Sequence, residues 1–207
     1  MDAHNSAENA KTREGLAPSF RPKLSFFHAS PRGTGCAMML ELLPAHGLTE
    51  GCIMMTLANQ LTIGDRRGPN PVYPTFDMEN RMVVKLGFLD LAKMLQVFRG
   101  ECETIDEDKG LYHRTAKFTS RITLRHVIEV SSGYALDIFR YGGGVEDQHA
   151  GIVLSSAEAM GLAKAIEDSL GVLCFGIPMV TEYELQQDLA LRQSLGKSQE
   201  GRNVHAA

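Results

Sequence analysis

One pattern that occurs twice constrains the fold of this chain more than any single residue does. In residues 81–95 and again in residues 149–163, a short β-forming run ends at a leucine, a helix-forming stretch follows at once, and a carboxylate lies four residues after that leucine. The matching positions are Leu86, Gly87 and Asp90 in one copy and Leu154, Ser155 and Glu158 in the other. A carboxylate at the third helical position accepts a hydrogen bond from the cap N–H and meets the positive end of the helix. Short strands are expected before each copy, so the chain is predicted to be a duplication of strands followed by a helix.

The expected elements divide into two equivalent halves. Alternation of apolar residues and turn signals predict four strands and then a helix in each half, which gives an internally duplicated α+β fold. In the first half the strands are expected at 23–29, 34–44, 52–59 and 81–86 and the helix at 88–99, with a long loop at 60–75. In the second half the strands are expected at 110–116, 120–130, 133–141 and 149–154 and the helix at 156–170, where Gly171 is the expected stop.

Segments of different character flank this expected domain. The predicted organisation is a disordered arm at 1–22, a single domain at 23–176 with repeats at 23–100 and 109–176, a C-terminal helix at 177–196 and a disordered tail at 197–207. The C-terminal helix begins with a capping box and carries a narrow apolar stripe, so docking on a neighbouring subunit is favoured slightly over docking on its own body.

The composition speaks against several classes of protein. No apolar run approaches the roughly 20 residues of a membrane helix. The four cysteines lie far apart, which favours reduced thiols and a cytoplasmic location, nucleoid-associated in a bacterium. The seven histidines have no partner at a metal-ligand spacing, and the glycines at 142–144 lack the strand-then-helix context of a dinucleotide loop. We therefore expect no enzyme activity, no catalytic residue, no metal and no cofactor.

Charge is distributed unevenly along the second half. The formal net charge of −4 by itself disfavours nucleic-acid binding. Residues 101–108 hold acidic and no basic side chains, however, and residues 109–128 hold basic and no acidic ones. A locally basic face attracts phosphate even on an acidic protein. The alternative interpretation is a solvated, charged strand surface.

Four segments resemble, in the same order, the Whirly family of single-stranded-DNA-binding proteins. Residues 51–58 (Gly-Cys-Ile-Met-Met-Thr-Leu-Ala) are similar to that family's Gly-Val-Ile-Met-Leu-Thr-Phe strand, and residues 76–81 (Phe-Asp-Met-Glu-Asn-Arg) to its Tyr-Asp-Trp-Glu-Lys-Arg. Residues 133–138 (Gly-Tyr-Ala-Leu-Asp-Ile) follow its Gly-Tyr-Phe-Ile-Ser-Leu, and residues 155–158 (Ser-Ser-Ala-Glu) its Thr-Thr-Ala-Glu. The resemblance implies two antiparallel four-stranded sheets, each followed by a helix, with helices packed into a homotetramer and nucleic acid along the sheet edges.

The chain departs from the family pattern at two places. The family's Lys-Gly-Lys-Ala-Ala-Leu signature falls on residues 34–39, where both lysines are missing. The family's tryptophan falls on Met78, and the chain contains no Trp. These departures bear on higher assembly and on the phosphate contacts of those lysines.

Residues 112–126 combine the two requirements of sequence-tolerant single-strand binding, since cations follow the phosphates and flat side chains accept unstacked bases. Strand alternation places Arg121 and Arg125 together on one face, with apolar residues on the other. Of the adjacent Phe26 and Phe27, one is expected to face out of its sheet. The predicted nucleic-acid-binding residues are Lys23, Phe26, Arg32, Phe76, Lys85, Tyr112, Arg114, Lys117, Phe118, Arg121 and Arg125. The alternatives are that the rings pack in the core and that the arginines pair with acids across strands.

These features predict a binder of single-stranded nucleic acid, DNA in preference to RNA, that is largely independent of sequence and acts in protection, repair, replication or transcription. An RNA-binding protein of the same fold and an oligomeric scaffold without nucleic-acid binding are the alternatives. Apolar residues beyond the helix stripes predict a homo-oligomer, most simply a tetramer, closed through the helix faces. These surplus residues are Val97, Val172, Leu173 and Phe175.

Overall fold

The computed structural model describes residues 23–45, 49–65, 67, 69–128, 132–144 and 146–175. Within them the fold is α+β, with two antiparallel sheets that are each followed by a helix. The arm predicted at 1–22, the helix at 177–196 and the tail at 197–207 lie outside the described residues.

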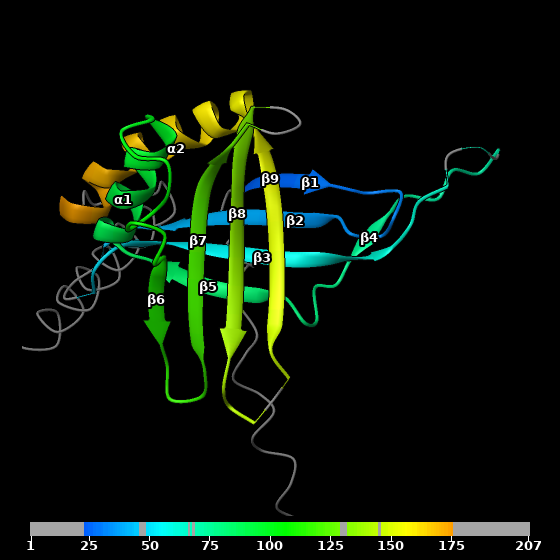
Figure 1. Ribbon diagram of the computed structural model, residues 1–207, viewed down its shortest axis with the longest axis horizontal. Coiled ribbons are helices and arrows are strands. Elements are labelled where there is room, and N and C mark those ends of the chain that lie inside the picture. The colour runs from blue at the N-terminus through cyan, green and yellow to red at the C-terminus, as the bar shows by residue number, and fades with distance from the viewer. Residues whose placement is uncertain are drawn as a thin grey trace, which may run out of the picture.

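The first sheet contains five strands, one more than the sequence predicted. They are β1 (Lys23–His28), β2 (Cys36–Leu43), β3 (Cys52–Thr62), β4 (Thr75–Phe76) and β5 (Met82–Leu86). The order is β1-β2-β3, and both β4 and β5 pair with β3. The segment predicted as a loop at 60–75 is partly extended, because β3 runs to Thr62 and Asp65 pairs with Val72. This segment projects from the body of the molecule beyond β4 (Figure 1).

The second sheet and the two helices match the predicted plan closely. The strands are β6 (Leu111–Arg114), β7 (Thr119–Val127), β8 (Gly133–Tyr141) and β9 (Gln148–Ser155), and the helices are α1 (Phe88–Phe98) and α2 (Ser156–Phe175). Each strand pairs with the next one in the chain. The strands of the second sheet run across those of the first, and both helices lie together at one end (Figure 1).

The helix α2 is longer than predicted, because it continues through Gly171 instead of ending there. A glycine inside a helix costs about 1 kcal/mol relative to alanine. The extra turn buries Leu173, which is 4% exposed, and burial of a leucine contributes about 1.5–3 kcal/mol. The apolar burial therefore outweighs the glycine.

The core is formed where the inner faces of the two sheets meet. Alternate residues of each strand point inward, as a half-buried strand requires. Fully buried side chains from both sheets and both helices join one cluster, represented by Met38, Met55, Leu57, Leu91, Ile122, Leu136, Ile138 and Ile166. Val97 and Leu173 are also buried in this chain, so the prediction that they form a free surface was wrong, whereas Phe175 is 84% exposed.

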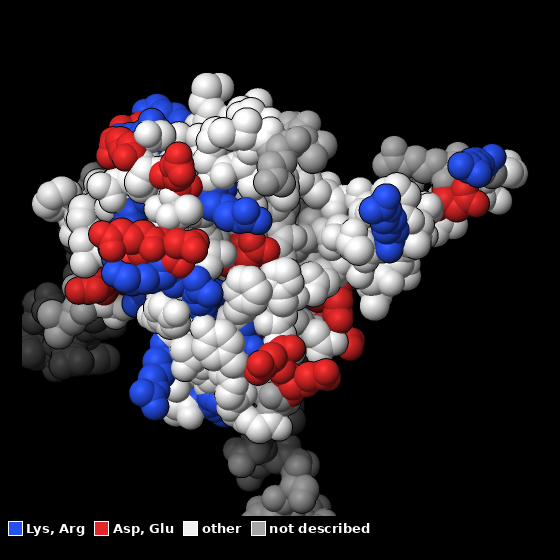
Figure 2. Space-filling model, viewed as in Figure 1, with Lys and Arg blue, Asp and Glu red and all other residues white. Residues whose placement is uncertain are grey.

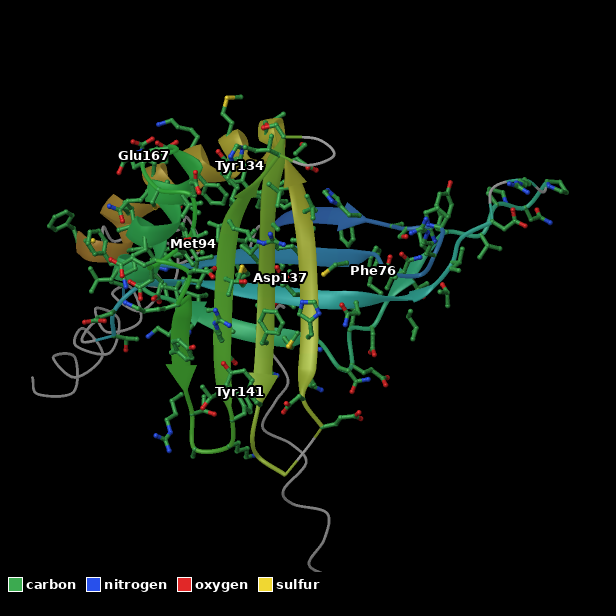
Figure 3. All side chains as sticks on the ribbon, viewed as in Figure 1. Phe76, Met94, Tyr134, Asp137, Tyr141 and Glu167 are labelled. Carbon is green, nitrogen blue, oxygen red and sulfur yellow. The ribbon has the colours of Figure 1, made fainter. Side chains whose placement is uncertain are left out.

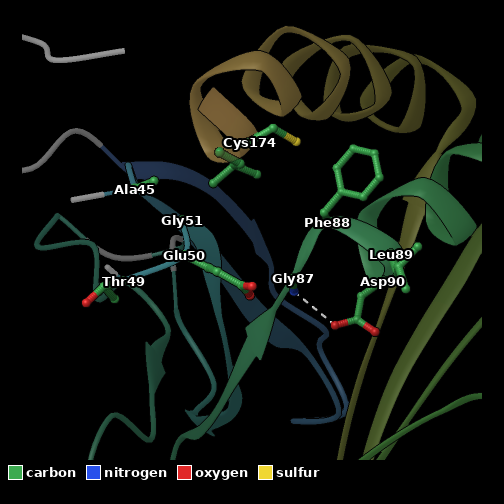
Figure 4. Close-up of a pocket in the computed structure, with 10 residues that line it drawn as sticks. Ala45, Thr49, Glu50, Gly51, Gly87, Phe88, Leu89, Asp90 and Cys174 are labelled. Atoms are coloured by element: carbon green, nitrogen blue, oxygen red, sulfur yellow. Dashed lines mark hydrogen bonds between the residues drawn. The ribbon is translucent and has the colours of Figure 1, made fainter. Parts of the chain in front are cut away.

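The two helix caps are equivalent, and the predicted carboxylate contacts are present in both. The Gly87 N–H donates to Asp90 Oδ2 at 2.9 Å, beside a cavity of about 740 Å³ between the start of α1 and the end of α2 (Figure 4). The Ser155 N–H donates to Glu158 Oε2 at 2.8 Å. Each carboxylate thereby satisfies a backbone donor that the helix leaves unpaired.

Each capping carboxylate also contacts a histidine from the other repeat. His113 Nε2 on β6 lies 3.2 Å from Asp90 Oδ2, and His28 Nε2 on β1 lies 2.8 Å from Glu158 Oε1. Burial acts to raise the pKa of both carboxyls, but the hydrogen bonds outweigh it and hold each pKa below its ordinary value. The first strand of each repeat is thus tied to the helix of the other.

Candidate nucleic-acid interface

Strand β7 has the face polarity that the sequence predicted. Ile122 and Leu124 are 0% and 1% exposed and point into the core, which confirms that Arg121 and Arg125 lie on the outer face. In antiparallel sheets, residues that are paired across strands share a face. The register therefore shows which side chains of β6, β8 and β9 accompany the two arginines.

Four rings share this outer face of the second sheet. In the strand register, Tyr112 of β6 is opposite Arg121 of β7, and Arg121 is opposite Phe139 of β8. Phe139 is in turn opposite His149 of β9, and Tyr141 is the next outward residue along β8. The Tyr112 side chain is 60% exposed. The Phe139 and His149 rings are stacked, with centroids 4.5 Å apart and planes 16° from parallel. We call Tyr112, Phe139, Tyr141 and His149 the second-sheet ring cluster.

Burial and nearby charged groups shift the pKa of the Tyr141 hydroxyl. Desolvation is the main cause that raises the pKa of its hydroxyl above the ordinary value, Tyr112 and Asp147 act in the same direction, and Arg121 opposes them. Figure 3 shows Tyr141 towards the end of β8 that lies away from the helices. These influences are consistent with a compact group in which rings, a cation and a carboxylate are close neighbours.

Asp137 orients His149 within this cluster. His149 Nε2 lies 2.8 Å from Asp137 Oδ1. The carboxylate reaches the imidazole across β9 at Gly151, where an added Cβ would lie only 2.1 Å from Asp137 Oδ1. The absence of a side chain at Gly151 is therefore what leaves room for this contact. Asp137 is one of the acids with which Arg121 or Arg125 could pair across strands in the alternative interpretation of the sequence, and the structure pairs it with His149.

The guanidinium of Arg121 donates to backbone carbonyls of the loop between α1 and β6, residues 101–110, which we call the acidic loop. Its Nε donates to the Lys109 carbonyl at 2.8 Å and its Nη2 to the Asp108 carbonyl at 2.7 Å. Asp106, Glu107 and Asp108 have φ values of 53°, 54° and 68°, a left-handed conformation that costs about 1–2 kcal/mol per non-glycine residue. Arg121 therefore stabilises this turn, and its role in nucleic-acid binding stays a prediction for the N–H groups that the turn leaves unused.

Three further predicted cations are exposed near the same face. Arg114 ends β6, Lys117 lies in the turn that follows, and Arg125 lies on β7. Figure 2 shows that Lys and Arg side chains on this side of the molecule lie beside Asp and Glu side chains instead of forming one continuous basic field. The local positive potential is therefore interrupted.

Phe118 makes a cation–π contact within the chain. Its ring lies under the guanidinium of Arg140, whose Cζ is 4.0 Å from the ring centroid. Arg140 is partly buried and donates to the Val83 carbonyl at 3.1 Å, and desolvation lowers the pKa of its guanidinium. This cation–π contact occupies one face of the Phe118 ring, and binding of nucleic acid by Phe118 stays a prediction.

In the first sheet the exposed aromatic is Phe27, not Phe26. Phe26 packs against the core, whereas Phe27 is 60% exposed and its ring centroid is 5.6 Å from that of Phe76. Because β1 and β4 lie on opposite sides of β2 and β3, these rings meet over Ala37 and Ala58, which are 0% and 1% exposed. The position of Phe76 on β4 can be followed in Figure 3.

The remaining predicted residues lie around the first sheet. Lys23 Nζ is 3.4 Å from Glu41 Oε2, Lys85 is exposed on β5, and Arg32 is exposed in the turn between β1 and β2. Because the sheets pack through their inner faces, the two outer faces point in opposite directions. The predicted residues therefore form two separate surfaces on one chain.

The sequence reasoning missed Phe27, Phe139, Tyr141 and His149 as site residues. Alternation along 133–141 places Phe139 and Tyr141 on the side opposite Ile138, so their outward direction could have been predicted from the sequence. The stack of His149 on Phe139 depends on the register of β8 and β9, which no sequence signal determined.

Other kinds of site were sought in the described part of the chain. It contains no group of three or more His, Cys, Asp or Glu residues placed to hold a metal ion. None of its helices is long and apolar enough to cross a membrane.

The fold and its surfaces define a class of protein, namely a duplicated α+β structure whose two sheets carry rings and cations on their outer faces. No protein-family model matches the chain, and no curated protein matches it. Solved structures do match. WHY1 from Arabidopsis thaliana has a TM-score of 0.61 at 13% identity, over 87% of this chain and 96% of that chain.

Two further solved structures agree with this result. WHY3 from Arabidopsis thaliana has a TM-score of 0.59 at 15% identity, over 76% of this chain and 90% of that chain. The plant transcriptional regulator PBF-2 has a TM-score of 0.59 at 14% identity, over 86% and 99%. The chain therefore has a Whirly-like fold, as the resemblance of its sequence implied.

Proposed function

We propose that this protein binds single-stranded nucleic acid, DNA in preference to RNA, without strong dependence on sequence. The observation that carries the proposal is the second-sheet ring cluster, which shares one outer face with Arg121 and Arg125. Rings accept unstacked bases and cations follow the phosphates, and these two contacts are sufficient for sequence-tolerant binding. The structural similarity to a plant transcriptional regulator supports the same class of function.

In this proposal the two contacts are divided between different elements. Tyr112 and the Phe139–His149 stack offer ring surface across the sheet, from edge strand β6 to edge strand β9, whereas Arg114, Lys117 and Arg125 lie around it and meet the nucleic-acid backbone. Duplex DNA keeps its bases stacked inside, so it gains only the phosphate contacts. Binding rather than catalysis is the proposed activity.

The proposal includes a homotetramer closed through helix faces and a cytoplasmic role on exposed strands in replication, repair or transcription. Exposed apolar side chains on the helices support self-association, because large apolar side chains at a surface mark contact sites when they are contiguous. Examples are Phe88, Leu89, Met160 and Phe175. Light scattering at micromolar protein measures the assembly directly, and a monomer mass contradicts this part.

The function is tested by titrating labelled oligo-dT, a matched RNA and a matched duplex at two salt concentrations. We expect the tightest binding to oligo-dT, weaker binding to RNA, and weak binding to duplex that added salt abolishes. The rival function is an oligomeric scaffold without nucleic-acid binding. The negative charge of the acidic loop beside the arginines favours it. Equally weak binding to all three probes, abolished by salt, supports that scaffold and contradicts the proposed function.

A further inference from the structure

A small cavity lies beside the second-sheet ring cluster. Its volume is about 220 Å³, and its walls are Arg121, Phe139, Tyr141, Asp147, Gln148 and His149. Three walls are rings and the other three carry hydrogen-bonding groups of different kinds. A guanidinium donates only, a carboxylate accepts only, and a carboxamide does both. Flat walls with polar groups among them suit a flat, polar ligand such as one unstacked nucleobase.

The ring walls of the cavity are held in position by their neighbours. Phe139 supports His149 from one side through the stacked contact, and Asp137 fixes the imidazole at 2.8 Å. Gly151 leaves the space that this carboxylate occupies. Arg121 is fixed by two carbonyls of the acidic loop. Oriented walls require little ordering when a ligand enters, which favours binding.

The charge of the cavity distinguishes between bases. Asp137 is engaged by His149, so Asp147 is the carboxylate in the cavity wall. An ionised carboxylate accepts hydrogen bonds from the exocyclic amino group of cytosine, adenine or guanine. Thymine and uracil have no amino group and present carbonyl oxygens on both sides of their single N–H, which a carboxylate repels.

We propose that this cavity is a base-binding subsite that takes one amino-bearing nucleobase of a bound single strand and rejects thymine and uracil. The inference rests on the proposed function and adds a base preference to it. Phe139, Tyr141 and His149 provide the apolar walls, Asp147 accepts from the amino group, and Arg121 donates from the N–H groups that the loop leaves unused.

The test compares oligo-dC with oligo-dT of about 12 nucleotides, a length within single-strand site sizes, at mildly alkaline pH where cytosine is unprotonated. For the full chain we expect oligo-dC to bind about tenfold more tightly, as one good base contact provides. Asp147→Asn should reduce this ratio to about twofold or less, because a carboxamide also donates to thymine.

Glu146→Gln is the matched control, since it removes the same charge one residue away from the cavity wall. It should strengthen binding of both oligonucleotides alike and leave their ratio unchanged. If Asp147→Asn does not fold, the NMR shifts of the His149 and Tyr141 rings on addition of dCMP or dTMP provide the same comparison on the unaltered chain, and dCMP should cause the larger change.

The outcomes separate this inference from the proposed function. Equal affinity for oligo-dC and oligo-dT, or equal ring shifts with dCMP and dTMP, overturns the base preference and leaves single-strand binding intact. Failure to bind either oligonucleotide overturns both. If Glu146→Gln changes the ratio of the oligo-dC and oligo-dT affinities as much as Asp147→Asn does, the preference is a general charge effect. This outcome also overturns the subsite.

Discussion

The outer faces of the two sheets differ although the repeats beneath them share one plan. On the first sheet, Phe27 and Phe76 contact each other over Ala37 and Ala58, and Phe27 remains 60% exposed. On the second sheet, the rings stand beside arginines, a histidine–carboxylate pair and a small cavity. The duplication thus preserves the strands and the helix caps, while the side chains at outward positions determine what each face can bind.

The inner faces and the helix caps, in contrast, keep the same role in both repeats. Asp90 and Glu158 make the same backbone contact and each meets a histidine of the other repeat. These contacts hold the two repeats together, so the loss of either one weakens the packing of one repeat on the other. The outward contacts described above do not join the two repeats, because Arg121 meets the carbonyl of Lys109 and Phe27 meets Phe76, each within its own repeat.

The largest expected effect comes from removing rings. Tyr112→Ala combined with Tyr141→Ala should weaken oligo-dC binding about a hundredfold, because each lost stack is worth about 1.4 kcal/mol, within the usual range. Phe27→Ala combined with Phe76→Ala should cost about tenfold or less, because those rings are partly used against each other. Fluorescence anisotropy provides both affinities, and circular dichroism checks folding. Equal losses would remove the functional distinction between the two faces.

The second prediction concerns stability. Arg121→Ala should lower the free energy of unfolding by about 2 kcal/mol, because a charged donor to two backbone carbonyls is lost. Lys85→Ala, an exposed cation on the first sheet, should change it by no more than about 0.5 kcal/mol. Urea denaturation measures both values. If the two variants are equally stable, Arg121 does not hold the left-handed turn.

The third prediction uses the lowered pKa values of Asp90 and Glu158. A carboxyl whose folded pKa is below the unfolded one contributes its full stabilisation above the ordinary carboxyl range and loses it as pH falls through the folded pKa. Asp90→Asn and Glu158→Gln should each cost about 1 kcal/mol at neutral pH, as loss of a cap does. Their deficit relative to the unaltered protein should vanish in acid.

Urea denaturation of both cap variants across the acid range makes this measurement. Deficits of similar size would show that the two caps are energetically equivalent. A deficit that persists unchanged in acid would mean that ionisation of these carboxyls has no part in it.

The smallest expected effect is on salt dependence. Arg125→Ala should reduce the log–log salt slope of oligo-dT binding by about 0.7, the value for one lost phosphate contact on a single strand. Lys85→Ala on the first sheet serves as the comparison and should change the slope less. A larger change for Lys85→Ala would assign the phosphate path to the first sheet.

The sequence predicted the strands and helices well because their signals are local. Alternation, glycine turns and the carboxylate four residues after Leu86 and Leu154 each depend on a few neighbouring residues. The same alternation correctly assigned the faces of β7. The sequence did not show the contacts that distant segments make with a side chain: Arg140 covers one face of Phe118, the acidic loop engages Arg121, and the core takes Phe26 and leaves Phe27 outside.

By itself the sequence determined the duplicated α+β plan, the two helix caps and the outward direction of Arg121 and Arg125, because periodicity and capping are properties of contiguous residues. Only the tertiary structure decided that Phe139 and His149 stack, that Asp137 reaches His149 over Gly151, and that the outer faces of the two sheets point in opposite directions. These features depend on strand register and sheet packing, which bring together residues that are far apart in the chain, and local preference does not encode such distances.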